Sequence, residues 1–245
     1  MKVAVITPYH EINTELQQCI DSVQQQDYGD VLHILIADGC ESVNSSSYDN
    51  VMVIPLPKNI ADYGDTPRSV GTIFAASLNV DAVCYLDSDN WYEADHISSL
   101  VELAQTSQQP LLTSLRNLCH INGKKMSVCP VSDGMKFSDT NCLFVTRSLF
   151  RQVASWWDMP ENMHAIGDRI IWDRLLHSAK GLACTNKATI NYRTRFAFHY
   201  LQCGEDVPVG CKPGHDIAQY QDQMSELKNR AKKRFQSFQR QPQTL

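Results

Sequence analysis

Short apolar runs alternate with amphipathic segments along the first half of the chain. The apolar runs are rich in β-branched residues and predict buried strands over residues 3–6, 31–37, 51–56 and 82–86. Between them, apolar residues recur at helical spacing and predict helices over residues 15–25, 68–78 and 94–105. Continuous apolar strands that alternate with helices are typical of a mostly parallel sheet with helices on both faces.

The second half of the chain has a more mixed pattern. Three apolar runs, at residues 111–117, 126–130 and 142–145, predict strands that extend the sheet. Two segments predict helices, at residues 148–154 and 168–178, and the stretch 188–200 alternates and is rich in aromatic residues. Residues 204–214 predict a loop, and a polar helix is expected from Asp216 to about Phe238. We therefore expect one α/β domain over residues 1–215 and a basic C-terminal helix or tail over 216–245.

Composition narrows the class of protein. The 245 residues are 43% hydrophobic and 20% charged, as in ordinary globular domains. The net charge of −5 gives no reason to expect a nucleic-acid partner. Nine cysteines without a C-x-x-C pair predict free, buried thiols in a reducing cytoplasm rather than a zinc site. Because no apolar stretch reaches about 18 residues, we expect a cytoplasmic protein without a transmembrane helix.

Polar residues directly follow three of the predicted strands, where parallel sheets bind ligands. The strongest of these features is the pair Asp87 and Asp89, two carboxylates that suit Mg²⁺ or Mn²⁺. A helix cap with a turn, in which Asp and Asn are also favoured, is the alternative for this pair.

Two further features fit the same edge of the sheet. The Asp38 carboxylate can accept a hydrogen bond from a base N–H, and Gly39 lets a ligand approach the backbone. Arg68 follows Pro67 at a helix start, where a diphosphate is favoured. A simple turn and a solvated surface arginine are the alternatives for these two features.

The order and spacing of several segments resemble family-2-type glycosyltransferases with the GT-A fold. The resemblance covers roughly residues 1–185 and is carried by residues 3–11, 16–26, 34–39, 67–71, 85–91, 141–147 and 167–176. It implies a nucleotide-diphospho-sugar donor, with a UDP-sugar as the default, and a divalent cation. It also implies sugar transfer to the hydroxyl of a saccharide, lipid-linked or small-molecule acceptor. The donor would bind in a half of about residues 1–110 and the acceptor in a half of about 111–215.

The resemblance also implies roles for individual residues. Thr7, Pro8 and Glu11 correspond to residues that line the nucleotide pocket, and Asp38 corresponds to the residue that holds the base. Arg68 corresponds to the residue beside the diphosphate, and Asp87 and Asp89 match the motif that holds the metal ion and the sugar. Asp168 corresponds to the general base of an inverting reaction. The family commonly has Glu-Asp at that motif, whereas this chain has Gly167-Asp168, and related families retain configuration without this base. Asp168 as a helix cap is the alternative, with Asp173 as a second candidate base.

Histidine and tryptophan residues supply further candidates. His199 and His215 match the late histidine that some GT-A enzymes use as a further metal ligand, and a histidine packed in the core among aromatic residues is the alternative for His199. Trp91 suits stacking on a sugar ring, while Trp156 and Trp157 suit stacking or core packing.

Two other functions stay open at this point. One is a metal-dependent sugar nucleotidyltransferase, although no glycine-rich loop follows the first strand. The other is a catalytically degenerate module that binds nucleotide-sugars. The C-terminal stretch carries Lys228, Arg230, Lys232, Lys233, Arg234 and Arg240, which suit a peripheral contact with anionic lipid, an anionic acceptor or a solvated surface helix.

Overall fold

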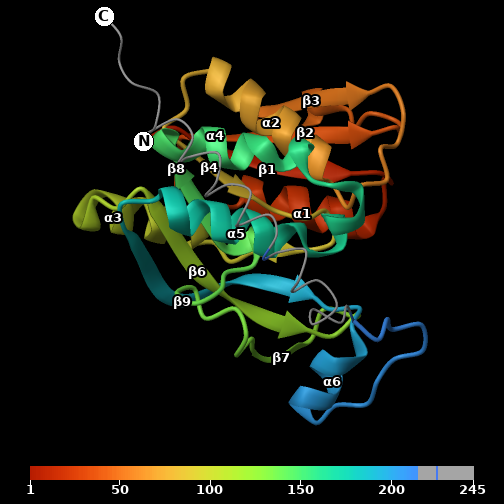
Figure 1. The fold of residues 1–245 in the computed structure, drawn as a ribbon. Coiled ribbons are helices and arrows are strands. Elements are labelled where there is room, and N and C mark those ends of the chain that lie inside the picture. Colours follow the sequence, from red (N-terminus) through yellow and green to blue (C-terminus); the bar gives the residue numbers. More distant parts are fainter. Residues whose placement is uncertain (215–224, 226–245) are drawn as a thin grey trace, which may run out of the picture. The chain divides into compact units, whose positions relative to one another are not determined.

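The computed structural model describes residues 1–214 and Ser225. The first compact unit spans Met1–Pro213 and holds the sheet and its helices (Figure 1). The expectations for His215, for the C-terminal helix and for its basic residues lie outside the described part of the chain.

Within residues 1–213, nine strands form one sheet in the order β3-β2-β1-β4-β8-β6-β9-β5, with β7 beside β6. The first four strands are parallel to one another: β1 (Val3–Tyr9), β2 (Val31–Asp38), β3 (Val51–Leu56) and β4 (Ala82–Tyr85). The others are β5 (Trp91–Tyr92), β6 (Leu111–Cys119), β7 (Lys125–Val128), β8 (Leu143–Thr146) and β9 (Leu182–Arg193). Beyond β4 the sheet becomes mixed, because β8 is antiparallel to both neighbours while β6 and β9 are parallel.

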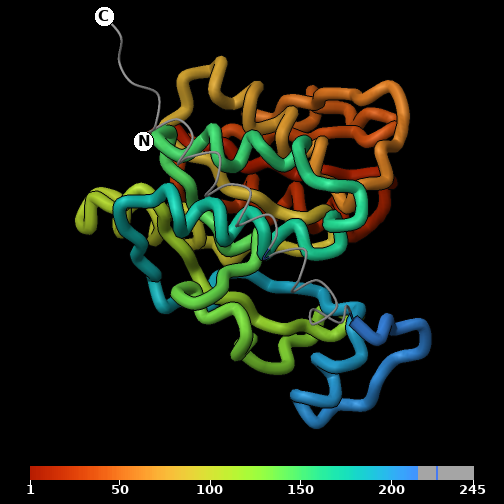
Figure 2. The backbone as a smooth tube through the Cα atoms, viewed as in Figure 1, coloured from red at the N-terminus to blue at the C-terminus, as the bar shows by residue number. Residues whose placement is uncertain are grey.

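Six α-helices are described in this unit. They are α1 (Thr14–Gln24), α2 (Asp65–Ser77), α3 (His96–Ser107), α4 (Phe150–Val153), α5 (Gly167–Ser178) and α6 (Ala197–Cys203). Short 3₁₀ turns lie at Ser45–Ser47, Thr140–Cys142, Arg147–Leu149, Ala154–Asp158 and Glu161–Ile166. Figure 2 follows the chain from the parallel strands in red and orange to the later strands in green and blue.

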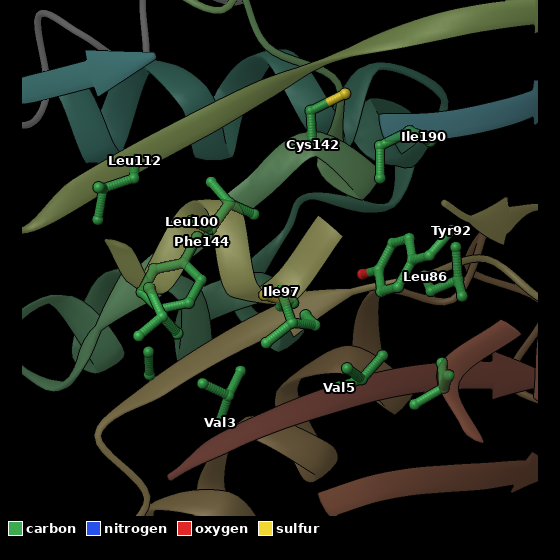
Figure 3. Packing of buried hydrophobic residues seen from close by; sticks show 14 of the residues in the cluster. Val3, Val5, Leu86, Tyr92, Ile97, Leu100, Leu112, Cys142, Phe144 and Ile190 are labelled. Carbon is green, nitrogen blue, oxygen red and sulfur yellow. The ribbon is translucent and has the colours of Figure 1, made fainter. Parts of the chain in front are cut away.

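The two faces of β1 pack against different helices. Val3 and Val5 join the core cluster that includes Ile97 and Leu100 of α3 (Figure 3). On the other face, Ile6 meets α2 so closely that a Cβ on Gly71 would lie 2.5 Å from the Ile6 side chain. Side chains that alternate between two buried faces explain why β1 is a continuous apolar run.

The predicted α/β architecture with flanking helices is confirmed, with local differences. Pro8 does not end β1, which continues to Tyr9. Since β4 pairs with β1 only as far as Ile6, the missing N–H of Pro8 disrupts no ladder on that side. The expected helix at 148–154 is broken into 3₁₀ turns around the four-residue α4, and β5 was not predicted because it has only two residues.

All nine cysteines are free thiols, as expected, although only five are buried: Cys19, Cys84, Cys119, Cys129 and Cys142. Among the described residues, no helix is both long and apolar enough to span a membrane.

Candidate active site

A cleft of about 780 Å³ lies beyond the carboxyl ends of β1, β2 and β4. Parallel strands bring their carboxyl ends to one edge, so polar residues that are distant in sequence meet there. Six of the residues assigned from sequence line this cleft: Pro8, Glu11, Asp38, Arg68, Asp87 and Asp89.

Asp87 is held by hydrogen bonds on both of its carboxylate oxygens. Arg68 Nη2 donates to Oδ1 at 2.5 Å, and Asn141 Nδ2 donates to Oδ2 at 3.0 Å. The backbone N–H of Asp87 in turn donates to Asn141 Oδ1 at 2.7 Å. Asn141 is 1% exposed, so the turn after β4 is fixed by a buried amide.

Arg68 is buried on α2 between two carboxylates. Its Nη1 lies 3.6 Å from Asp65 and donates to the Tyr63 carbonyl at 2.9 Å, and its guanidinium lies over the Trp156 ring. Burial alone would lower the pKa of Arg68, but the carboxylates of Asp87 and Asp65 outweigh it and raise the pKa. Arg68 is therefore a fixed positive charge in the cleft wall.

Asp89 differs from Asp87 in its surroundings. Its side chain is 34% exposed, and Oδ2 lies 3.6 Å from Arg195 Nε. Burial, and then the neighbouring Asp87 carboxylate, raise the pKa of Asp89 to about 6, against the lowering effect of Arg195. Asp89 is thus a carboxylate that lacks sufficient positive charge around it.

The cleft as a whole also has more negative than positive charge. Among the described residues that line it, six carboxylates face two guanidiniums: Glu11, Glu15, Asp38, Asp62, Asp87 and Asp89 against Arg68 and Arg195. A negatively charged diphosphate enters such a cleft readily only when a cation accompanies it.

The described residues do not group three His, Cys, Asp or Glu side chains in a way that could enclose a metal ion. Mg²⁺ and Mn²⁺ are commonly held by one or two carboxylates together with substrate phosphates and waters. Asp89 fits that mode, because it lines the cleft and carries the raised pKa that a nearby cation would relieve.

Asp38 lies at the end of β2, where Oδ1 accepts a hydrogen bond from Ile60 N at 3.0 Å. Burial, and then Asp62, raise its pKa, against the lowering effect of Ile60 N–H and His10. Gly39 has φ +69°, and a Cβ there would meet the backbone of Asn59 at 1.9 Å. The 58–59 backbone fills the space of a side chain at Gly39 and accounts for the glycine, so the approach of a ligand to its backbone stays a prediction.

Four residues assigned from sequence lie outside the lining of this cleft. Thr7 is buried, and its Oγ1 lies 2.9 Å from His33 Nε2. Trp91 packs against the Arg193 guanidinium, 4.9 Å from the ring centre. Asp168 and His199 come from the second half of the chain. Their roles stay predictions, as do those of Thr7 and Trp91.

Asp168 lies in the first turn of α5, and its Oδ1 accepts a hydrogen bond from Arg169 N at 2.8 Å. Burial, and then Asp139, raise its pKa, against the lowering effect of Arg169 and Arg116. The surroundings of the preceding Gly167 leave no room for a glutamate. A Cβ there would lie 2.9 Å from a carboxylate oxygen of the buried Asp65, so a glutamate would meet both a clash and a like charge.

His199 is 2% exposed and packs among aromatic rings, with Phe198 at 4.0 Å between ring centres. Its Nδ1 lies 2.6 Å from Thr194 Oγ1. Burial, and then Arg116, lower its pKa to about 4, so the ring is neutral at pH 7. A neutral imidazole suits a metal ligand, but its rim of aromatic rings equally suits core packing.

Trp156, Trp157 and Asp173 have different surroundings. Trp156 is buried beside Tyr85, which gives it a packing role, whereas Trp157 is 65% exposed. Asp173 lies 3.6 Å from His177 on the same helix.

Several site residues were not assigned from the sequence, among them Glu15, Asp62, Asn141 and Arg195. Glu15 and Arg195 form an ion pair across 180 positions, a separation that no local pattern reveals. Asn141 belongs to segment 141–147, which is part of the family resemblance. That resemblance was the only feature of the sequence that could have indicated a role for Asn141.

No family model matches the chain, and no curated protein matches it. Solved structures do. S. aureus TarS residues 1–349 in complex with UDP-GlcNAc matches with 16% identity and a TM-score of 0.65, over 79% of this chain and 59% of that one. The TarS complex with UDP matches with 15% identity and a TM-score of 0.63, over 83% and 63%.

A third match is the mannosyltransferase PcManGT from Pyrobaculum calidifontis in complex with GDP-Man and Mn²⁺. It has 8% identity and a TM-score of 0.56, over 79% of this chain and 57% of that one. The chain thus spans about three fifths of each structure. At these identities the matches show the fold, which is GT-A-like.

Proposed function

We propose that this chain transfers a sugar from a nucleotide-diphospho-sugar to an acceptor hydroxyl, and that it needs a divalent cation to do so. One observation carries the proposal: Asp87, locked between Arg68 and Asn141, stands beside the open carboxylate of Asp89 in one large cleft. The GT-A-like fold, which TarS uses in its UDP-GlcNAc complex, supports a nucleotide-sugar as the ligand.

Each of the cleft residues binds a different part of the donor in this proposal. Asp38 accepts a hydrogen bond from the base, with Pro8 and Glu11 beside the nucleotide. Arg68 stabilises the diphosphate, and Asp89 holds the cation together with the phosphates, with Asp87 and His199 as further candidate ligands. The cation, when bound, stabilises the charge that develops on the leaving diphosphate.

Asp168 acts as the base in this proposal. A carboxylate whose pKa is raised accepts a proton from an attacking hydroxyl more readily than one with an ordinary pKa. Asp139 and Arg116, two of the three charged neighbours that shift the pKa of Asp168, belong to the network that fixes Asn141. The same side chains would therefore influence the catalytic base Asp168 and fix the position of the donor site.

Calorimetric titration with UDP, GDP, CDP and ADP, with and without Mn²⁺, tests donor binding. We expect Mn²⁺-dependent binding of one nucleotide, weakened at least about tenfold in Asp89→Asn, since a charged contact is worth about 1.5–3 kcal/mol. Asp95→Asn is the matched control, because Asp95 is an exposed ion-pair partner of Lys187. Failure of the wild-type protein to bind any of these nucleotides would contradict the proposal.

Turnover separates the activities that share this kind of cleft. Incubation with Mn²⁺ and a sugar conjugate of the nucleotide that binds should release the nucleoside diphosphate, slowly with water as acceptor. Release of pyrophosphate from a nucleoside triphosphate and a sugar phosphate would indicate a nucleotidyltransferase instead. Binding without turnover across an acceptor panel would indicate a binding module.

A further inference from the structure

Arg195 places a partly exposed positive charge beside Asp89. It follows β9, lines the cleft, and its side chain is 42% exposed. Its Nη2 lies 2.6 Å from Glu15 Oε2, and its Nε lies 3.6 Å from Asp89 Oδ2. A single guanidinium is therefore shared between two of the carboxylates that make the cleft negative.

Glu15 has a second cation, and that one is fixed. Arg193 Nε lies 3.5 Å from Glu15 Oε1, and the Arg193 side chain is 6% exposed. Its Nη1 donates to the Asp89 carbonyl at 2.8 Å, and its Nη2 donates to Gln18 Oε1 at 2.8 Å. If Arg195 turned away, Glu15 would keep Arg193 as a partner, whereas the Asp89 carboxylate would be free to accept another cation.

We propose that Arg195 is an exchangeable counter-ion of the cleft. It pairs with Asp89 in the free protein and offsets part of its charge, leaves Asp89 when a divalent cation binds there, and then pairs with the diphosphate of the nucleotide. The inference rests on the proposed function, because it names the residue that couples cation binding to donor binding at that site.

Charge and chemistry support the exchange. A divalent cation on Asp89 repels a guanidinium that lies 3.6 Å from the same carboxylate. An arginine forms two parallel hydrogen bonds with a phosphate, so the diphosphate is a favourable new partner. The long, partly exposed side chain can reorient without disturbing buried packing.

The exchange predicts opposite effects on the two ligands. Without Arg195, Mn²⁺ has no competitor for Asp89 and should bind more tightly, by roughly threefold to tenfold. At saturating Mn²⁺, UDP or whichever nucleoside diphosphate the wild type prefers has lost a phosphate partner and should bind roughly tenfold more weakly. A residue that merely supported the structure would weaken both.

The test uses the full chain with Arg195→Met, Arg195→Lys and the control Lys187→Met. Lys187 is on β9, the strand that Arg195 follows, is exposed, and lies 3.3 Å from Asp95, away from the cleft lining. Mn²⁺ binding is titrated first without nucleotide, by electron paramagnetic resonance of free Mn²⁺. The nucleoside diphosphates are then titrated by calorimetry at saturating Mn²⁺, and thermal melts check that each variant is folded.

We expect Arg195→Met to gain Mn²⁺ affinity and lose nucleotide affinity, Arg195→Lys to fall between it and the wild type, and Lys187→Met to match the wild type. Unchanged binding of both ligands in a folded Arg195→Met, or weakening of both, would overturn the exchange alone. If Arg195→Met does not fold, the same opposite shifts are required of Arg195→Lys. A wild-type chain that binds no nucleotide at all overturns the proposed function, and the exchange with it.

Discussion

The cleft and the buried network beside it balance their charges in different ways. The network consists of Arg116, Asp139 and Asn141. Arg116 Nη1 lies 2.5 Å from Asp139 Oδ2, its guanidinium packs on the Tyr192 ring, and Asp139 Oδ1 accepts from Asn141 Nδ2 at 2.7 Å. Each charge there has an internal partner, whereas the cleft keeps more carboxylates than guanidiniums.

The difference separates two tasks. A paired, buried network fixes the position of Asp87 through Asn141, and it gains nothing from a ligand. In the cleft, the repulsion among the excess carboxylates is unfavourable, and a bound cation would relieve it. The substitutions below test this contrast by removing one charge from each region, and the largest effect is expected in the network.

Arg116→Met should destabilise the protein by about 3–5 kcal/mol, because it leaves Asp139 buried and unpaired. The free energy of unfolding, measured in urea, checks this. Lys125→Met is the matched control, since Lys125 lies at the same 2.5 Å from Glu93 but is 53% exposed, and it should cost less than about 1 kcal/mol. Equal losses in the two variants would remove the distinction between the network and an ordinary surface pair.

The buried interior of the sheet should respond to pH through His33 of β2. Burial lowers its pKa from 6.5 to about 3, so below pH 6.5 the unfolded chain takes up a proton that the native state refuses. Stability from this group is complete at high pH and falls as the pH drops toward 3, by about 2 kcal/mol between pH 7 and 5.

His33→Gln should remove that contribution while keeping a polar group near Thr7. We expect the loss of stability between pH 7 and 5 to be about 2 kcal/mol smaller in the variant than in the wild type. Urea unfolding at the two pH values measures it. The carboxylates with raised pKa act in the opposite direction in both proteins and cancel in the difference. An identical pH dependence would mean that His33 is protonated in the native state.

The sequence was informative where chemistry follows from position along a strand. Asp38 and Asp87 could be assigned to one edge because parallel strands place their carboxyl ends together, whatever their separation in the chain. The pairing of Glu15 with Arg195 depends on where β9 ends relative to α1, a tertiary relation that no periodicity encodes.

In the second half of the chain, the sequence pattern predicted the elements and site residues less well than in the first half. Residues 188–200 alternate, yet the alternation covers the end of β9 and the start of α6, because the chain turns at Thr194. Asp168 and His199 were assigned by motif alone, and each has partners within its own surroundings. A motif predicts the residue type at a position, but the neighbours that set its pKa come from other elements.

The smallest effect, and one of opposite sign, is expected in the cleft. The pKa of Asp89 is raised from 3.8 to about 6, so the native state favours the protonated carboxyl, and its ionised form destabilises the fold above pH 6. Asp89→Asn should therefore stabilise the metal-free protein at pH 8, by roughly 1 kcal/mol once solvent screening at this partly exposed side chain is counted. The gain should vanish near pH 4, where the wild-type carboxyl is already protonated in the native state and partly so in the unfolded chain. Urea unfolding with a chelator at pH 8 and pH 4 measures both. A loss of stability at pH 8 would mean that Asp89 is fully compensated by Arg195, and the cleft would then be as balanced as the network.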